Sequence, residues 1–162
     1  MSKVSMSVNP RIKGKRGPIF VGEAPSKSQP KAVVHYGHVF GPMCGITAMQ
    51  WYRRVRRCNV LEEWPGQQGR GSSFPMGPAV PAAEALLPLL AGQDVVCLGK
   101  RVASALGAPR APYCAWRSLA WPTLGGIEAR LAIFPHPSGV NAWWNDERNR
   151  AQATLFMRRL LL

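Results

Sequence analysis

The chain has 162 residues, with 21 Lys or Arg against 8 Asp or Glu and a formal net charge of +13 at pH 7. This length suits one domain with one hydrophobic core, and no apolar run approaches the roughly 18 residues that a membrane-spanning helix needs. The charge favours a polyanionic partner, above all nucleic acid, although a basic surface kept for solubility or association with the ribosome would give the same totals.

The N-terminal segment 1–17 is basic and lacks the hydrophobic stretch of a secretory signal. We expect it to be a flexible arm in front of a single domain at 18–162. The four cysteines include no C-x-x-C pair. Without a sign of secretion, this pattern favours free thiols in a cytoplasmic protein that has no contact with a membrane.

Short runs rich in β-branched or aromatic residues, each ending at Gly, Pro or a polar residue, predict buried strands, and the segments between them predict helices. In chain order, we expect a strand at 18–21, a helix at 45–57, a strand at 58–61, a helix at 81–92, a strand at 94–99, a helix at 99–108, a strand at 130–135 and a helix from about 145 to 162. This alternation predicts an α/β protein with three α/β/α layers around a central, mostly parallel four-stranded sheet.

Polar and conformationally special residues follow each predicted strand. The segments are "GEAPSKSQPK" (22–31), "EEWPGQQGRG" (62–71), "KRVAS" (100–104) and "HPSGVN" (136–141). In parallel sheets ligands bind beyond the carboxyl ends of the strands, where these segments meet. The sequence therefore predicts a site at that edge, with the long segments 22–45 and 62–81 as site-forming loops.

Two common kinds of site are disfavoured. A phosphate-binding P-loop would need Gly where Asp94 stands, five residues before Gly99, and no G-x-G-x-x-G follows a strand. His35 and His38 with Cys44 suggest zinc, but no second pair of ligands has suitable spacing.

Two residues have alternative interpretations. Asn59 is either a capping or turn residue at a strand edge, or an amide that reads the polar edge of a pyrimidine, since it offers both a donor and an acceptor. Phe40, among glycines and a proline, either fills the core or stacks on a base.

Five stretches of the chain, in their order and spacing, resemble the uracil-DNA glycosylase superfamily. They are "VGEAPS" (21–26), "VFGPMCG" (39–45), "CNVL" (58–61), "VVCLGKRVASALG" (95–107) and "FPHPSGVN" (134–141). Gly-Glu-Ala-Pro resembles the first motif of the thermostable iron–sulfur branch, and His-Pro-Ser resembles the second motif of the superfamily.

The resemblance implies a role for each of four residues. Glu23 would orient or activate the attacking water, and its negative charge would stabilise the developing positive charge on the sugar. His136 would hydrogen-bond the pyrimidine O2 as negative charge builds on the departing base. Asn59 would read the edge of the base, and Phe40 would stack on its face.

Further residues are implied around the base and the DNA backbone. The base pocket would include Gly22, Ala24 and Tyr36, and either Tyr36 or His35 would be placed to close it against a 5-substituent. The backbone would be gripped by Ser26, Lys27, Lys100, Ser138 and Gly139, which helps to extrude the nucleotide. Val140 would be the wedge that fills the vacated stack, with Trp143 or Trp144 as alternatives if they are not core residues.

The chain also departs from the iron–sulfur branch. That branch needs four cysteine ligands including an N-terminal pair, and no cysteine precedes Gly22 here. We therefore expect no cluster, no other metal and no cofactor. The short chain resembles a compact, phage- or mobile-element-type version, active in a bacterial or phage-infected cell.

The function expected from this resemblance is that of a monomeric, monofunctional uracil-DNA glycosylase. It would flip uracil or a modified pyrimidine from single- or double-stranded DNA, hydrolyse its N-glycosidic bond and leave an abasic site. The alternative is a catalytically silent protein of the same fold that binds damaged or modified DNA. An RNA-binding or ribosome-associated basic protein is a third interpretation.

Overall fold

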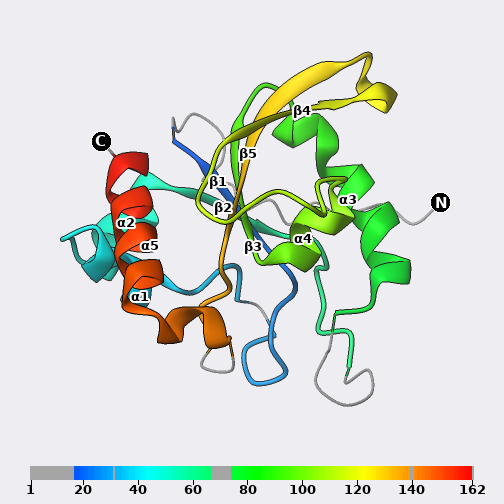
Figure 1. The fold of residues 1–162 in the computed structure, drawn as a ribbon. Helices are drawn as coiled ribbons and strands as arrows, with labels where there is room; N and C mark the ends of the chain where they lie inside the picture. The colour runs from blue at the N-terminus through cyan, green and yellow to red at the C-terminus, as the bar shows by residue number, and fades with distance from the viewer. Residues whose placement is uncertain (1–16, 31, 67–73, 139–140, 162) are drawn as a thin grey trace.

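The computed structural model describes residues 17–30, 32–66, 74–138 and 141–161, and Figure 1 shows its fold. Its elements in chain order are β1 (Ile19–Gly22), α1 (Gly37–Met43), α2 (Ala48–Arg54), β2 (Arg56–Asn59), α3 (Met76–Leu90), β3 (Asp94–Leu98), α4 (Lys100–Ala105), β4 (Arg117–Trp121), η2 (Pro122–Leu124), β5 (Ile127–Phe134), η3 (Ala142–Asn145) and α5 (Glu147–Leu160). The predicted arm at 1–17 lies, except for its last residue, outside the described residues.

The strands form one five-stranded sheet in the order β2-β1-β3-β5-β4. Strands β2, β1, β3 and β5 are parallel, whereas β4 runs antiparallel to β5 at the edge. The predicted α/β class with a mostly parallel central sheet is confirmed, but the predicted count of four strands is wrong. The predicted strands were identified as buried apolar runs, whereas only Trp121 of the five residues of β4 is buried.

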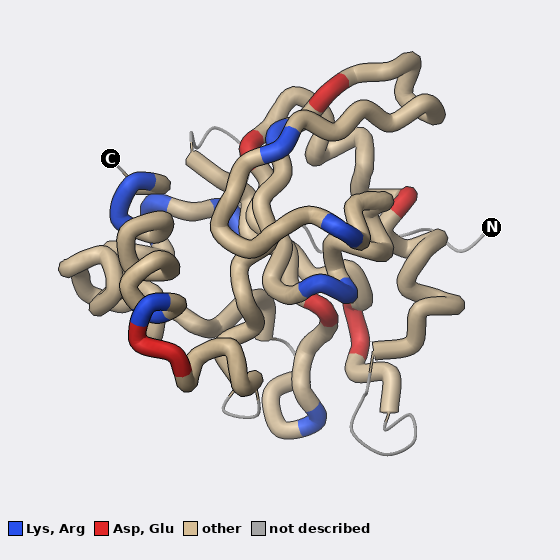
Figure 2. The backbone as a smooth tube through the Cα atoms, in the orientation of Figure 1, with Lys and Arg blue, Asp and Glu red and all other residues tan. Residues whose placement is uncertain are grey.

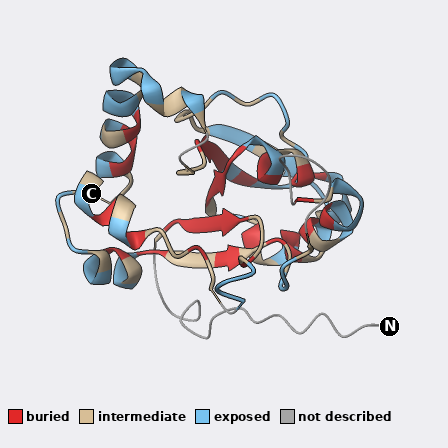
Figure 3. Cartoon of the chain, turned by 90° about the horizontal axis from the view of Figure 1, so that it is seen from below, coloured by how far each residue is buried: buried red, intermediate tan, exposed pale blue. Residues whose placement is uncertain are grey.

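Alternate residues of the inner strands point to opposite faces of the sheet, as the pleat requires. In β1, Ile19 and Val21 belong to one buried cluster and Phe20 to the other. Helices α3 and α4 cover the first face, and α1, α2 and α5 cover the second (Figure 1). Figure 3 shows the buried sheet residues enclosed between these layers. The three-layer arrangement is therefore the predicted one.

Helix α1 was not predicted, because its glycines and Pro42 suggested a loop. The glycines are instead packing residues. A Cβ on Gly41 would lie 2.8–2.9 Å from backbone atoms of Thr47 and Ala48, and a Cβ on Gly37 would lie 2.6 Å from the Tyr52 ring. Small residues thus allow α1 to approach α2 closely, which ordinary turn rules do not anticipate.

The remaining helices lie where they were predicted, with shifted ends. Helix α2 begins after Thr47, whose hydroxyl accepts a hydrogen bond from Gln50 N–H while the Gln50 side chain accepts from Thr47 N–H. This capping box explains why the helix begins at residue 48 rather than 45. Helix α3 begins at Met76, five residues before the predicted start, and continues through Pro81 and Pro88.

The carboxyl ends of the four parallel strands lie at the lower edge of the sheet in Figure 1, where the segments after β1, β2, β3 and β5 come together. This carboxyl edge is where the sequence predicted a site. Among the described residues, no helix is long and apolar enough to cross a membrane.

Candidate functional site

Glu23 directly follows β1, and the chain around it is held by β2. The carbonyl oxygens of Gly22 and Glu23 accept hydrogen bonds from the N–H groups of Val60 and Leu61, both at 2.9 Å. The pairing of the two strands therefore continues past their formal ends and sets the direction of the Glu23 side chain. Gly22 is required here, since a Cβ would lie 2.7 Å from Asn59 Oδ1 and 3.0 Å from Val34.

The Glu23 carboxylate is half-buried and poorly compensated. Within the described ranges it makes no hydrogen bond or ion pair. Burial raises the pKa of Glu23 above its usual value, and the positive charge of Arg101 partly offsets this rise. A carboxylate that is desolvated yet unpaired is uncommon as a structural feature and is typical of functional sites.

His136 follows β5 after one proline and is held through its backbone. Its carbonyl oxygen accepts hydrogen bonds from Trp144 Nε1 at 2.9 Å and from Asn141 Nδ2 at 3.2 Å. The Asn141 side chain also accepts from Trp143 N–H at 3.1 Å, which caps the short helix η3. The side chains of Asn141 and Trp144 thus hold the His136 backbone in place.

The imidazole of His136 has one defined tautomer. Its Nδ1 accepts a hydrogen bond from Ser138 N–H at 3.2 Å, so Nδ1 carries no proton. Burial lowers the pKa of His136, and Arg101 lowers it further, so the ring is neutral near pH 7. The single proton therefore lies on Nε2, which points to Tyr36 Oη at 3.3 Å and donates to that oxygen.

Tyr36 is hydrogen-bonded to the imidazole and lies within the electrostatic influence of the acid. Its ring lies edge-on to His136 with centroids 5.5 Å apart, and its hydroxyl takes the hydrogen bond from Nε2. Burial and the nearby negative charge of Glu23 both raise the pKa of Tyr36. The structure thus brings Glu23, Tyr36 and His136 together, although 113 positions separate the first from the last.

Arg101 completes this group, and sequence reasoning missed it. It is the second residue of α4, and its charge acts on both Glu23 and His136. The approach of β3 to β5 explains its place: Gly99 N–H donates to Phe134 O at 2.8 Å, and a Cβ on Gly99 would lie 3.6 Å from His136 Cβ. The signal was the basic pair after the third strand, from which only Lys100 was chosen.

Two of the predicted base-binding residues are engaged elsewhere in this conformation. Phe40 is fully buried and packs against Phe20, Trp51 and Phe134, with ring centroids 5.3–5.9 Å apart. Its ring is therefore a core residue here, and no face of it is open to a base. Asn59 lies beside Gly22 at the end of β2, and its Nδ2 donates to the Ala32 carbonyl at 3.1 Å.

The predicted backbone-binding residues belong to three different segments that follow β1, β3 and β5. Ser26 accepts a hydrogen bond from Gln29 N–H at 3.1 Å within a turn. Ser138 uses its N–H on His136, so that group is not open to a phosphate. Lys100 is exposed, with its Nζ 4.9 Å from the centre of the Tyr113 ring.

The other predicted residues divide into three groups. Ala24 is half-buried next to Glu23. Gly139 and the proposed wedge Val140 lie outside the described residues. Trp143 and Trp144, the alternative wedges, are half-buried and pack on Tyr113 and Phe134 respectively, so they are core residues.

Charges of both signs lie at the carboxyl edge. Figure 2 shows Lys and Arg at the starts of α4 and α5, with Asp and Glu close beside them. In the described part of the chain, no three His, Cys, Asp or Glu side chains come close enough together to hold a metal ion.

Comparison of the sequence with protein-family models and with curated proteins gives no match. The class of this protein is therefore described by its fold and by the chemistry of its candidate site. It is an α/β protein whose carboxyl edge combines a carboxylate without a partner among the described residues, a neutral imidazole with its proton on Nε2, and a tyrosine hydrogen-bonded to that imidazole.

Proposed function

We propose that the protein is a DNA glycosylase that flips uracil or a related pyrimidine out of DNA and hydrolyses its N-glycosidic bond. One observation carries the proposal. A flat ring, that of Tyr36, already lies beside His136 and within the field of Glu23, and its oxygen accepts the His136 Nε2 hydrogen bond. A pyrimidine carbonyl requires the same donor in the same direction.

The proposed reaction uses both charged groups. As the bond between the sugar C1′ and the base N1 lengthens, its electron pair moves to the base, and His136 Nε2–H stabilises the charge that builds on O2. The sugar becomes oxocarbenium-like, and the Glu23 carboxylate stabilises it and orients the attacking water. The water oxygen bonds to C1′ and its proton passes to Glu23 or solvent, which leaves an abasic site. Because no lysine attacks C1′, the strand stays intact.

Arg101 would serve both groups in this reaction. Its charge favours the ionised form of Glu23 and the neutral form of His136. It would also favour the departing base as an anion, because negative charge near it is stabilised. We assign Arg101 a positioning role, exerted through its field.

Base entry would require Tyr36 to move. Its hydroxyl occupies the hydrogen bond that the base would form, and Phe40 behind it is fully buried. Tyr36 is held by stacking on His35, with centroids 5.0 Å apart, and Val34 just before has a left-handed φ of 42°, which a β-branched residue rarely adopts. The segment 34–36 would be the hinge for this opening, and the flipped base would replace the tyrosine ring.

The hydrogen bond between His136 and Tyr36 also favours a second candidate function, that of a catalytically silent protein that binds modified DNA. If Tyr36 stays in place, the imidazole remains occupied and no base reaches Glu23. Such a protein would bind damaged or modified DNA without releasing the base.

The experiment is incubation with single-stranded oligonucleotides that carry one uracil, 5-hydroxymethyluracil, hypoxanthine or thymine, followed by heating in alkali. Breakage at the modified position, seen only after alkali, supports the glycosylase. Intact strands bound more tightly than unmodified DNA support the silent binder. Equal binding of all strands without breakage contradicts both and favours a general basic protein. The same assay with the Glu23→Gln variant tests whether breakage depends on this carboxylate. Glu84→Gln, which makes the same change at an exposed acid on α3, is its matched control.

A further inference from the structure

Trp64 is exposed at the carboxyl edge, which is unusual for this residue type. All six tryptophans lie in the described residues, and Trp64, at 38% exposure, is the only one in the exposed class. It belongs to neither buried cluster. Core packing therefore does not explain why a tryptophan stands in the segment after β2.

The segment that carries Trp64 runs beside the one that carries Glu23. Leu61 N–H donates to Glu23 O at 2.9 Å, and Trp64 lies three residues beyond Leu61. Lys27, four residues beyond Glu23, returns to the same point, with its Nζ 5.6 Å from the centre of the Trp64 ring. Four residues of extended chain reach at most about 14 Å, so this pair lies within a few nucleotides of the site.

We propose that Trp64 and Lys27 form a subsite for a nucleotide next to the flipped one, with its base stacked on the indole and its phosphate on the ammonium. This inference rests on the proposed function. Indole faces suit stacking with any base, and a lysine is a flexible point charge that turns from the ring to a phosphate. The Ser26 and Ser28 hydroxyls, 3.2 Å apart beside Lys27, add donors on the same side.

The charged neighbours of Trp64 favour one position for the DNA backbone. Glu62 and Glu63 are exposed and directly precede Trp64. Negative charges disfavour a phosphate close to them, whereas Lys27 attracts one, so the backbone is expected at Lys27. The subsite would thus bind one face of an unpaired base and favour single-stranded DNA beside the lesion.

The test is the affinity of Trp64→Ala for a uracil oligonucleotide, measured by fluorescence anisotropy at fixed salt in a Glu23→Gln background that keeps the DNA intact. Loss of one stacked base should weaken binding about 5- to 150-fold, and Trp64→Phe should lose less. Ile127→Ala, which shortens an exposed apolar residue at the opposite end of β5, should leave affinity unchanged. Lys27→Ala should reduce the slope of log K against log salt by about one.

Abasic spacers locate the stacked base. With a spacer at one position within three nucleotides of the uracil, Trp64→Ala should no longer weaken binding, because the partner base is gone. Unchanged affinity of Trp64→Ala, or a loss that persists with every spacer, would overturn the subsite. Equal affinity and Trp64 dependence with an RNA strand would assign the surface to RNA and overturn the assignment to DNA. Uracil release by wild-type protein, measured separately, tells a failed subsite from a failed glycosylase.

Discussion

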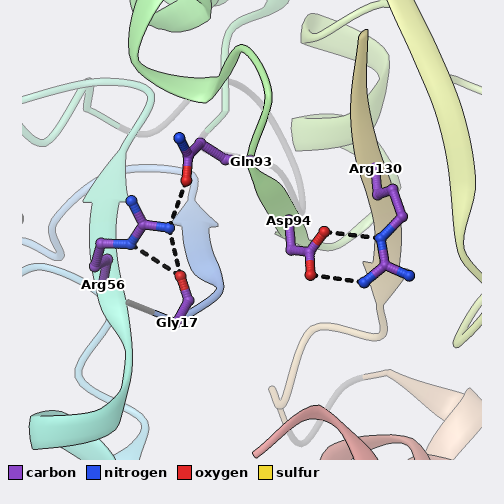
Figure 4. Close-up of polar contacts among 5 residues, drawn as sticks. All are labelled: Gly17, Arg56, Gln93, Asp94 and Arg130. Carbon is purple, nitrogen blue, oxygen red and sulfur yellow. Dashed lines mark hydrogen bonds and ion pairs between the residues drawn. The ribbon is translucent and has the colours of Figure 1, made fainter. Parts of the chain in front are cut away.

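Charged residues differ between the carboxyl edge and the opposite, amino edge, where the four parallel strands begin. At the amino edge, Arg130 and Asp94 form a bidentate pair with distances of 2.8 and 2.6 Å (Figure 4). Arg56 donates to the Gly17 carbonyl and to Gln93 Oε1, which ties the start of β1 to β2 and β3. Each of these charges has a partner of fitting geometry.

At the carboxyl edge, Glu23 and His136 are half-buried, and neither forms an ion pair among the described residues. Glu23 has no hydrogen bond or ion pair within the described ranges, and burial raises its pKa. His136 donates to a tyrosine hydroxyl rather than to an acid, and burial lowers its pKa. Desolvation without pairing costs stability, so we interpret this edge as built for chemistry and the amino edge as built for the fold.

The largest effect should come from the carboxyl edge. Glu23→Gln and His136→Ala should each lower the single-turnover rate of uracil excision by about 10²–10³, because each removes a group that stabilises charge only in the transition state. DNA affinity should stay close to wild type, and the melting temperature of Glu23→Gln should not fall, because the variant removes a desolvated charge. Excision at the wild-type rate by both variants would contradict the interpretation of the carboxyl edge as the catalytic one.

Tyr36→Phe should have a smaller effect of opposite sign. It deletes the oxygen that occupies His136 Nε2 but keeps the ring. If the base must displace this hydrogen bond, worth about 1 kcal/mol net, a uracil oligonucleotide should bind up to about fivefold more tightly. Weaker binding, measured by anisotropy, would mean instead that the hydroxyl itself holds the base.

Arg101→Gln should change the pH profile of excision. The reaction needs ionised Glu23 and neutral His136, so the rate falls as pH decreases. Burial raises the pKa of Glu23 and lowers that of His136, and Arg101 lowers both. Without this charge both pKa values rise, so the acid limb should move to higher pH and the rate just below it should fall a few-fold. An unmoved limb would show that Arg101 does not act on these groups.

Asp94→Asn should have the smallest effect, confined to stability. Asp94 and Arg130 side chains are 42% and 56% exposed, and such a pair contributes at most about 1 kcal/mol. The hydrogen bond from Arg130 lowers the pKa of Asp94, so the contribution is present above the ordinary aspartate pKa and disappears as pH falls through the lowered one. Thermal melts of variant and wild type should differ at pH 6 and converge in acid, with excision unaffected.

Much of this arrangement could be predicted from the sequence. Alternating strands and helices predicted the sheet, and the rule of strand ends placed Glu23 and His136 at one edge, where the structure has them. The alternation of strands and helices can be predicted because local hydrophobic periodicity is visible in the sequence. The position of the site follows from the topology that this alternation implies.

The rest depends on packing that sequence does not express. The glycines of α1 suggested a loop but allow close helix contact, and β4 is an exposed edge strand. The hydrogen bond from His136 Nε2 to Tyr36 and the one from Ser138 N–H to His136 Nδ1 form only once the loops meet. Arg101 was missed because its effect lies in its field rather than in a motif.

The most direct test of the central claim is a crystal structure of the Glu23→Gln variant with a uracil-containing oligonucleotide. The account predicts the base between residues 23 and 136, its O2 within hydrogen-bond distance of His136 Nε2, and Tyr36 displaced from that atom. Tyr36 still bonded to His136, with the uracil stacked in the strand or bound elsewhere, would contradict it.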